Sequence, residues 1–126
     1  MRSTVGLIAH DRKKPELAAW TDAHVDLLRH HRLVATATTG SVLRQARPDL
    51  DLHLVKSGPL GGDQQIGAMI AQGELDILIF FPDPLEAQPH DVDVKALLRL
   101  VLVYDTPAAF SPKTANALVA SGLLDP

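Results

Sequence analysis

A glycine-rich stretch that ends on a carboxylate, SGPLGGD (57–63), is the part of the chain that most directly indicates chemistry. Its three glycines lie within five positions, which marks a backbone that bends sharply or passes close to another group. The apolar residues Ile66, Met69 and Ile70 follow at helical spacing and predict that Asp63 stands at the start of a helix. A helix N-cap would explain this aspartate as well as a reactive carboxylate would.

A second cluster, TATTG (36–40), is suited to a phosphate. The hydroxyls of Thr36, Thr38 and Thr39 precede a predicted helix, whose first backbone N–H groups favour an anion. Further donors for the same anion are the ammonium of Lys14, the Ser57 hydroxyl and the Gly58 N–H. Taken singly, each of these groups also fits an N-cap, a solvated lysine or an ordinary turn.

Two histidines and three aspartates could act on a ligand held by such a cradle. His10 and His90 fall at predicted strand ends or loops, where an imidazole can polarise a carbonyl or transfer a proton near neutral pH. The three aspartates are Asp11, Asp63 and Asp83. A carboxylate beside a phosphorylated ketone can remove a proton α to the carbonyl, while a neutral imidazole stabilises the enediolate that forms.

Composition sets the class of protein. With 126 residues and 46% hydrophobic content, we expect one compact domain over residues 1–126. A net charge of -3 gives no electrostatic footprint for nucleic acid or an anionic membrane. The chain has no cysteine, which excludes disulfides and thiol-ligated metals and is compatible with a cytoplasmic protein. The spacing of His90, Asp91 and Asp93 matches no strong metal pattern, so we expect no metal.

The elements that must position these residues alternate along the chain. Strands are predicted at 4–9, 33–37, 52–55, 74–81 and, weakly, 107–110. Helices are predicted at 15–31, 63–72, 94–104 (or a helix passing into a strand) and 113–121, and a turn at 38–40 leads into a further helix that ends near 47. This alternation predicts a three-layer α/β domain with a five-stranded, mainly parallel sheet. Each polar cluster follows the carboxyl end of a predicted strand, the edge at which such sheets bind ligands.

Five motifs in fixed order resemble the methylglyoxal synthase family: IAHDRKK, TATTG, SGPLGGDQQIGA, IFFPDPL and PHDVDVKALLRL. The resemblance covers roughly residues 5–104. It implies a flavodoxin-like α/β domain and a lyase without metal or cofactor, which converts dihydroxyacetone phosphate to methylglyoxal and inorganic phosphate. It also implies a cytoplasmic homohexamer that phosphate inhibits.

The same resemblance implies roles for individual residues. Asp63 would be the base that takes the C3 proton, His90 and His10 would contact the carbonyl and hydroxyl end, and Asp83 would assist proton handling. The residues that would hold the substrate, chiefly its phosphate, are Lys14, Thr36, Ala37, Thr38, Thr39, Ser57 and Gly58. Elimination further requires the C–O bond to phosphate to stand perpendicular to the enediolate plane, so the cradle must orient as well as bind.

The chain departs from the family pattern at several positions. Ala37 stands where a glycine is usual, Pro82 where a bulky residue is expected, and Phe110-Ser111 where a Thr-Asn pair is common. No arginine follows Arg99, which puts in question an allosteric link to a neighbouring subunit.

Two rival functions remain at this point. A non-catalytic, phosphate-ligand-binding regulatory domain of the same fold, as in carbamoyl phosphate synthetase, would need the cradle but not the acid and histidine set. A metal-dependent phosphohydrolase would need a carboxylate cluster with metal spacing. The presence of Asp63, Asp83, His10 and His90 together favours the lyase.

Overall fold

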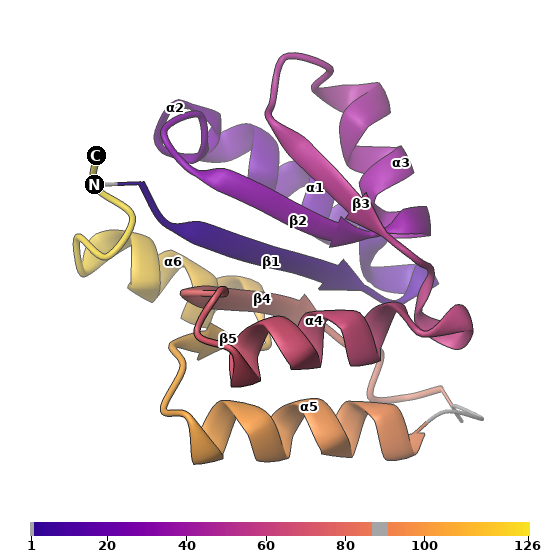
Figure 1. The fold of residues 1–126 in the computed structure, drawn as a ribbon. Coiled ribbons are helices and arrows are strands. Elements are labelled where there is room, and N and C mark those ends of the chain that lie inside the picture. The colour runs from indigo at the N-terminus through magenta and orange to yellow at the C-terminus, as the bar shows by residue number, and fades with distance from the viewer. Residues whose placement is uncertain (1, 87–90) are drawn as a thin grey trace.

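Five short strands form one parallel sheet at the centre of the molecule (Figure 1). The computed structural model describes residues 2–86 and 91–126, and for 91–93 it describes the backbone alone. The strands are β1 (Thr4–Ala9), β2 (Arg32–Thr36), β3 (Leu52–Val55), β4 (Ile77–Phe81) and β5 (Ala108–Ala109), in the order β3-β2-β1-β4-β5. Every neighbouring pair is parallel, which confirms the predicted fold class.

Helices cover both faces of the sheet and complete the three layers. On one face lie α1 (Lys14–Ala23), α2 (Val25–Leu28), α3 (Ala37–Ala46) and α6 (Pro112–Ala120), and on the other lie α4 (Gly62–Ala71) and α5 (Asp91–Val103). Two 3₁₀ turns, η1 (Asp11–Lys13) and η2 (Gly58–Leu60), follow β1 and β3. No helix in the described ranges has the length and apolar character needed to cross a membrane.

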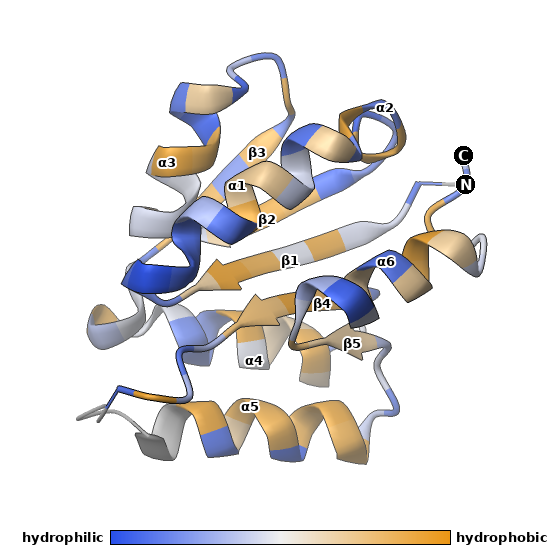
Figure 2. Ribbon diagram, turned by 180° about the vertical axis from the view of Figure 1, so that it is seen from behind, coloured by the Kyte–Doolittle hydropathy of each residue, from blue (hydrophilic) through white to orange (hydrophobic). Residues whose placement is uncertain are grey.

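The strand sequences explain this layering. Each residue of β4, ILIFF, is buried, as a strand covered on both faces requires. Along β1, Val5 and Leu7 pack into the core on the α1 side, whereas Ile8 packs into the core on the α4 side. Figure 2 shows the hydrophobic colouring of β4 and α5 from behind.

The structure corrects some element boundaries. The helix predicted at 15–31 is two helices, because α1 ends at Ala23 and α2 begins at Val25, with His24 between them. Leu17 and Leu28 both reach the same core cluster, about three helical turns apart, so the apolar spacing hides the break. The region 94–104 is helical to Val103 and does not pass into a strand. β4 begins at Ile77, not at 74.

The strand order places a crevice at one defined point of the sheet. From β1 the chain first builds outward to β2 and β3, and it then returns to add β4 on the other side of β1. In open α/β sheets, ligands bind outside the carboxyl ends of the two strands at which the order reverses. These strands are β1 and β4, which His10 and Pro82 follow directly.

Candidate active site

A pocket of about 140 Å³ opens at this edge of the sheet. It brings together predicted residues from three separate segments of the chain, namely His10, Lys14, Thr36, Thr38, Gly58 and Asp63. Asp11 and Glu86 also line it. The pocket therefore combines a lysine, hydroxyl groups, an imidazole and a buried carboxylate within a space suited to a small phosphorylated molecule.

Asp63 owes its position to the three glycines that precede it. Gly61, with φ of 105°, is the N-cap of α4, so Asp63 stands in the first turn and is not the N-cap. A Cβ on Gly62 would lie 1.8 Å from the Lys56 carbonyl oxygen, and a Cβ on Gly58 would lie 3.3 Å from Asp63 Oδ1. The glycines thus let the η2 backbone pass directly beside a buried carboxylate, at a helix end that favours negative charge.

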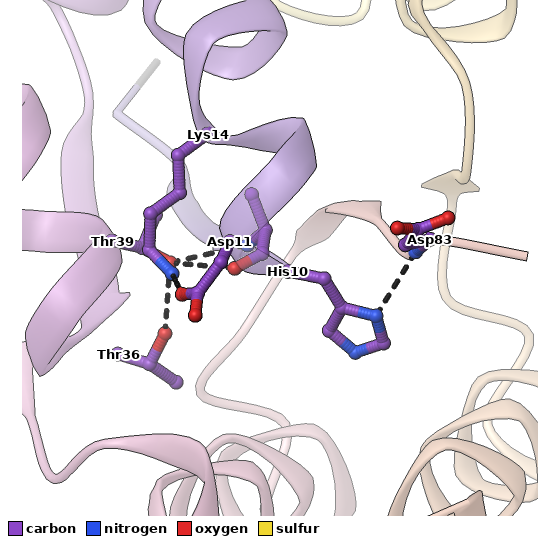
Figure 3. A network of polar contacts seen from close by, with 7 residues as sticks. His10, Asp11, Lys14, Thr36, Thr39 and Asp83 are labelled. Carbon is purple, nitrogen blue, oxygen red and sulfur yellow. Dashed lines mark hydrogen bonds and ion pairs between the residues drawn. The ribbon is translucent and has the colours of Figure 1, made fainter. Parts of the chain in front are cut away.

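His10 is held by the loop that follows β4. Its Nδ1 accepts a hydrogen bond of 2.9 Å from the backbone N–H of Asp83 (Figure 3), and its ring packs edge-on against Phe80 at 5.4 Å. A backbone N–H can only donate, so Nδ1 carries no proton in this arrangement. The neutral ring therefore carries its proton on Nε2, which makes that nitrogen a hydrogen-bond donor.

The Asp83 side chain contacts its own loop and Arg12 of η1, and it does not reach the pocket that the described residues form. Its Oδ1 accepts a hydrogen bond of 3.1 Å from the Leu85 N–H, and its Oδ2 lies 4.0 Å from Arg12 Nε. Within the described residues, Oδ2 has no hydrogen-bond partner, and Asp83 does not line the pocket. The group that reaches toward the pocket is thus the Asp83 amide, through His10.

Lys14 is held at the pocket by a neighbouring carboxylate. Its Nζ lies 2.5 Å from Asp11 Oδ1, and its side chain is 12% exposed whereas that of Asp11 is 94% exposed (Figure 3). The hydrogen bond from Lys14, together with its charge, lowers the pKa of Asp11 below the ordinary value. Asp11 therefore stays ionised near neutral pH and orients the ammonium.

The threonines divide between two tasks. Thr36 is the N-cap of α3, and both it and Thr38 line the pocket. The buried Thr39 hydroxyl instead accepts from the Ala9 N–H at 3.2 Å, donates to the Ala9 carbonyl at 3.2 Å, and pairs with Thr36 Oγ1 (Figure 3). Thr39 thus ties the start of α3 to the end of β1, and its hydroxyl is absent from the lining formed by the described residues.

The remaining predicted residues lie around or beyond this pocket. Ala37 is the first residue of α3, with its N–H 3.4 Å from the Lys56 carbonyl oxygen, and Ser57 is the N-cap of η2. Neither belongs to the lining that the described residues form. His90 lies outside the described residues. No three His, Cys, Asp or Glu side chains gather into a metal site within the described part of the chain.

Sequence reasoning missed four of the lining residues: Ile8 and Ala9 at the end of β1, and the loop residues Pro59 and Glu86. Pro59 lies inside the quoted glycine stretch, and Glu86 lies three residues after Asp83 in the same loop. The rule that ligands bind at the carboxyl edge, applied to whole loops instead of to reactive side chains, would have included both.

Comparison with known proteins identifies the family. Residues 16–110 match the family model described as the MGS-like domain. The chain is 57% identical over 118 residues to the methylglyoxal synthase of Brucella ovis, covering 94% of each chain. It is 57% identical over 115 residues to that of Rhizobium etli, covering 91% of each. The crystal structure of methylglyoxal synthase from Elizabethkingia anophelis matches with a TM-score of 0.92 and 48% identity, over 98% of this chain and 81% of that chain.

The chain therefore belongs to the MGS-like domain family, and its α/β fold has a pocket at the reversal of strand order. Within that family its curated relatives and the solved structure are methylglyoxal synthases, so the chain is an enzyme of the lyase class.

Proposed function

We propose that this enzyme eliminates phosphate from dihydroxyacetone phosphate to give methylglyoxal and inorganic phosphate. The observation that carries the proposal is that a buried carboxylate, Asp63, lines the same pocket as Lys14 and the N-terminal end of α3. An enolising base and a phosphate cradle so close together suit a three-carbon phosphorylated ketone.

The phosphate is held at the start of α3. The ammonium of Lys14 and the hydroxyls of Thr36 and Thr38 line that side of the pocket. The first N–H groups of a helix have no partner within the helix, and they bind anions together with the helix dipole. The further contacts that we propose are the backbone N–H groups of Ala37, Thr39 and Gly58 and the hydroxyl of Ser57.

The proton steps take place at the opposite end of the substrate. Asp63 removes a proton from C3, and the electron pair of that C–H bond forms the enediolate. His10 donates from Nε2 to the carbonyl oxygen as negative charge develops there. His90 is the second proposed contact at this end, and Asp83 assists by keeping His10 in the donating tautomer.

The C3 hydroxyl then gives up its proton, its electron pair forms the aldehyde, and the C3=C2 pair shifts to C2=C1 as phosphate leaves C1. The enol so formed gains a proton at C1 and gives up the proton on its C2 oxygen to become methylglyoxal. Phosphate leaves only if its C–O bond stands perpendicular to the enediolate plane, where the antibonding orbital overlaps the π system. Holding the phosphate at α3 and the reacting carbon at α4 fixes the substrate at two points. This restricts the torsion angle that sets the C–O bond relative to the enediolate plane.

The proposal extends to the assembly and the regulation of the enzyme. We propose a cytoplasmic homohexamer that inorganic phosphate inhibits, since product phosphate fits the same cradle as the substrate phosphate. Support for self-association comes from the apolar outer side of α5, where Leu102 is 79% exposed and Val103 is also exposed.

The test is to incubate the purified protein with dihydroxyacetone phosphate and excess chelator and to quantify methylglyoxal and phosphate separately. We expect equal release of both, unaffected by chelator. Phosphate without methylglyoxal would indicate hydrolysis, and binding of phosphate without any product would indicate a sensor domain. The matched control is Asp63→Asn, which should release neither product.

A further inference from the structure

We propose that Arg12 is a positioning residue of this enzyme, which acts through Asp83 to hold His10 in its donating tautomer. The inference rests on the proposed role of His10 at the substrate carbonyl. It assigns a task to an exposed side chain that does not itself line the pocket formed by the described residues.

The first step concerns the carboxylate of Asp83. This side chain is 5% exposed, and only its Oδ1 accepts a hydrogen bond from the described residues. A buried ionised oxygen without a hydrogen bond is unfavourable unless a nearby charge compensates it. Arg12 supplies that charge, with its Nε 4.0 Å from Asp83 Oδ2. An ion pair with one buried partner is screened less than an ordinary surface pair.

The second step concerns the other cations of the same segment, HDRKK (10–14). Lys13 Nζ lies 3.3 Å from Glu16 Oε1, and Lys14 Nζ pairs with Asp11. Each of the three consecutive cations thus has a different carboxylate partner, and the partner of Arg12 is Asp83. Of these three carboxylates, that of Asp83 is the buried one.

The third step connects Asp83 to the imidazole. The Asp83 N–H donates to His10 Nδ1 at 2.9 Å, and the His10 N–H donates to the Phe81 carbonyl at 3.1 Å. The Asp83 carboxylate is linked to the backbone of its loop, because Oδ1 accepts from the Leu85 N–H at 3.1 Å and so holds the turn that presents the Asp83 N–H to Nδ1. Without Arg12, the carboxylate gains by turning toward water. That rotation breaks its bond to the Leu85 N–H and loosens the turn, so the Asp83 N–H is no longer held at Nδ1.

The expected result for Arg12→Met is a fall in kcat of about 5- to 30-fold, below the roughly 10²-fold that a 1 Å misplacement in an active site can cost. The KM for dihydroxyacetone phosphate should change less than twofold, because the phosphate cradle is untouched. Arg12→Lys should recover most of kcat, since the contact is one of charge without a hydrogen bond. Lys13→Met removes the same charge one residue away and should leave kcat unchanged.

A spectroscopic measurement separates positioning from general loss of structure. Long-range ¹H–¹⁵N correlations of His10, assigned by their loss in His10→Gln, report which ring nitrogen carries the proton. The wild-type protein should show the Nε2–H tautomer. Arg12→Met should show a mixture of the two tautomers while it still unfolds cooperatively, with a Tm only slightly lowered because the carboxylate turns toward water.

Three outcomes would overturn the inference: wild-type kcat in Arg12→Met, an equal loss in Lys13→Met, or a pure Nε2–H tautomer in Arg12→Met. A KM that is higher in Arg12→Met than in the wild type at low salt, but equal in the two proteins at high salt, would also contradict it. That result would show that Arg12 acts by long-range attraction of the anionic substrate. Absence of methylglyoxal from the wild-type protein would instead reject the proposed function, so the two failures are distinguishable.

Discussion

The backbone N–H of Asp83 donates to Nδ1 of His10 across the two strand ends at which the sheet reverses its order. This single bond of 2.9 Å joins the loop after β1 to the loop after β4. It also selects the tautomer of His10, because a ring nitrogen that accepts a hydrogen bond cannot carry a proton. A main-chain group thus defines what a side chain can donate.

Asp63→Asn tests the proposed base. The amide has nearly the same shape but cannot accept a proton at C3, so kcat should fall by at least the roughly 10²–10⁴-fold that general base catalysis contributes. Titration calorimetry should show that phosphate still binds within about twofold of the wild type, because the proposed cradle lies at the start of α3 and does not include the Asp63 carboxylate. Near wild-type turnover would remove Asp63 from the mechanism.

Gly58→Ala tests the close approach of backbone to base. The added methyl would lie 3.3 Å from Asp63 Oδ1 and 3.5 Å from Oδ2, so the carboxylate must shift by a fraction of an ångström. We expect kcat to fall by about tenfold or more, since small misplacements of reacting groups are costly, with little change in Tm.

Gly61→Ala is the contrasting variant for that experiment. Nothing lies within 4 Å of its added methyl, but φ is 105°, a conformation that costs a non-glycine residue on the order of 1 kcal/mol. It should lower stability more than Gly58→Ala does. The opposite ranking of the two Tm values would contradict this account of the loop.

Thr39→Val tests the division of labour among the threonines. Removing the hydroxyl leaves the Ala9 N–H without its partner, which should cost about 1–3 kcal/mol of unfolding free energy. Urea denaturation measures this loss. Thr38→Val, in the next position, should weaken phosphate binding and leave stability nearly unchanged, since Thr38 is exposed at the pocket. Equal losses of stability in the two variants would contradict these separate roles for Thr38 and Thr39.

Asp11 gives a pH-dependent prediction. Lys14 lowers the pKa of Asp11 in the folded protein, so the pair stabilises the fold above the unfolded value of about 4 and loses that contribution as pH falls through the lower folded value. The unfolding free energy of Asp11→Asn should therefore lie slightly below that of the wild type at pH 6. The gap should close at pH 2–3 and shrink in high salt, because Asp11 is exposed. A constant gap at all pH values would refute the pairing.

Sequence patterns predicted the edge of the sheet at which the site lies but not the direction of every side chain on it. Thr38 and Thr39 are adjacent in one motif, yet consecutive helical residues point about 100° apart, so one hydroxyl lines the pocket and the other is buried against β1. Thr36 and Thr39, three residues apart, meet at 3.2 Å.

Asp83 is a stronger example of a side chain whose direction the sequence pattern does not predict. Its position after the most apolar strand marks it as a residue of the ligand-binding edge. Whether its carboxylate or its amide faces the imidazole depends on the turn made with Leu85, which is a property of the folded loop. The break at His24 was likewise hidden, because both helices face one core.

The strand order has a consequence for how the enzyme emerges during synthesis. β1 pairs with β2 within some thirty residues, but it must wait for β4, since Val5 aligns with Ile77. Closing so long a loop is slower than pairing near neighbours. We therefore expect the half of the pocket proposed to hold phosphate, between β1 and α3, to assemble while the later chain is still being made. The half that orients His10 forms only when β4 arrives, so a nascent chain acquires the ability to bind before the ability to react.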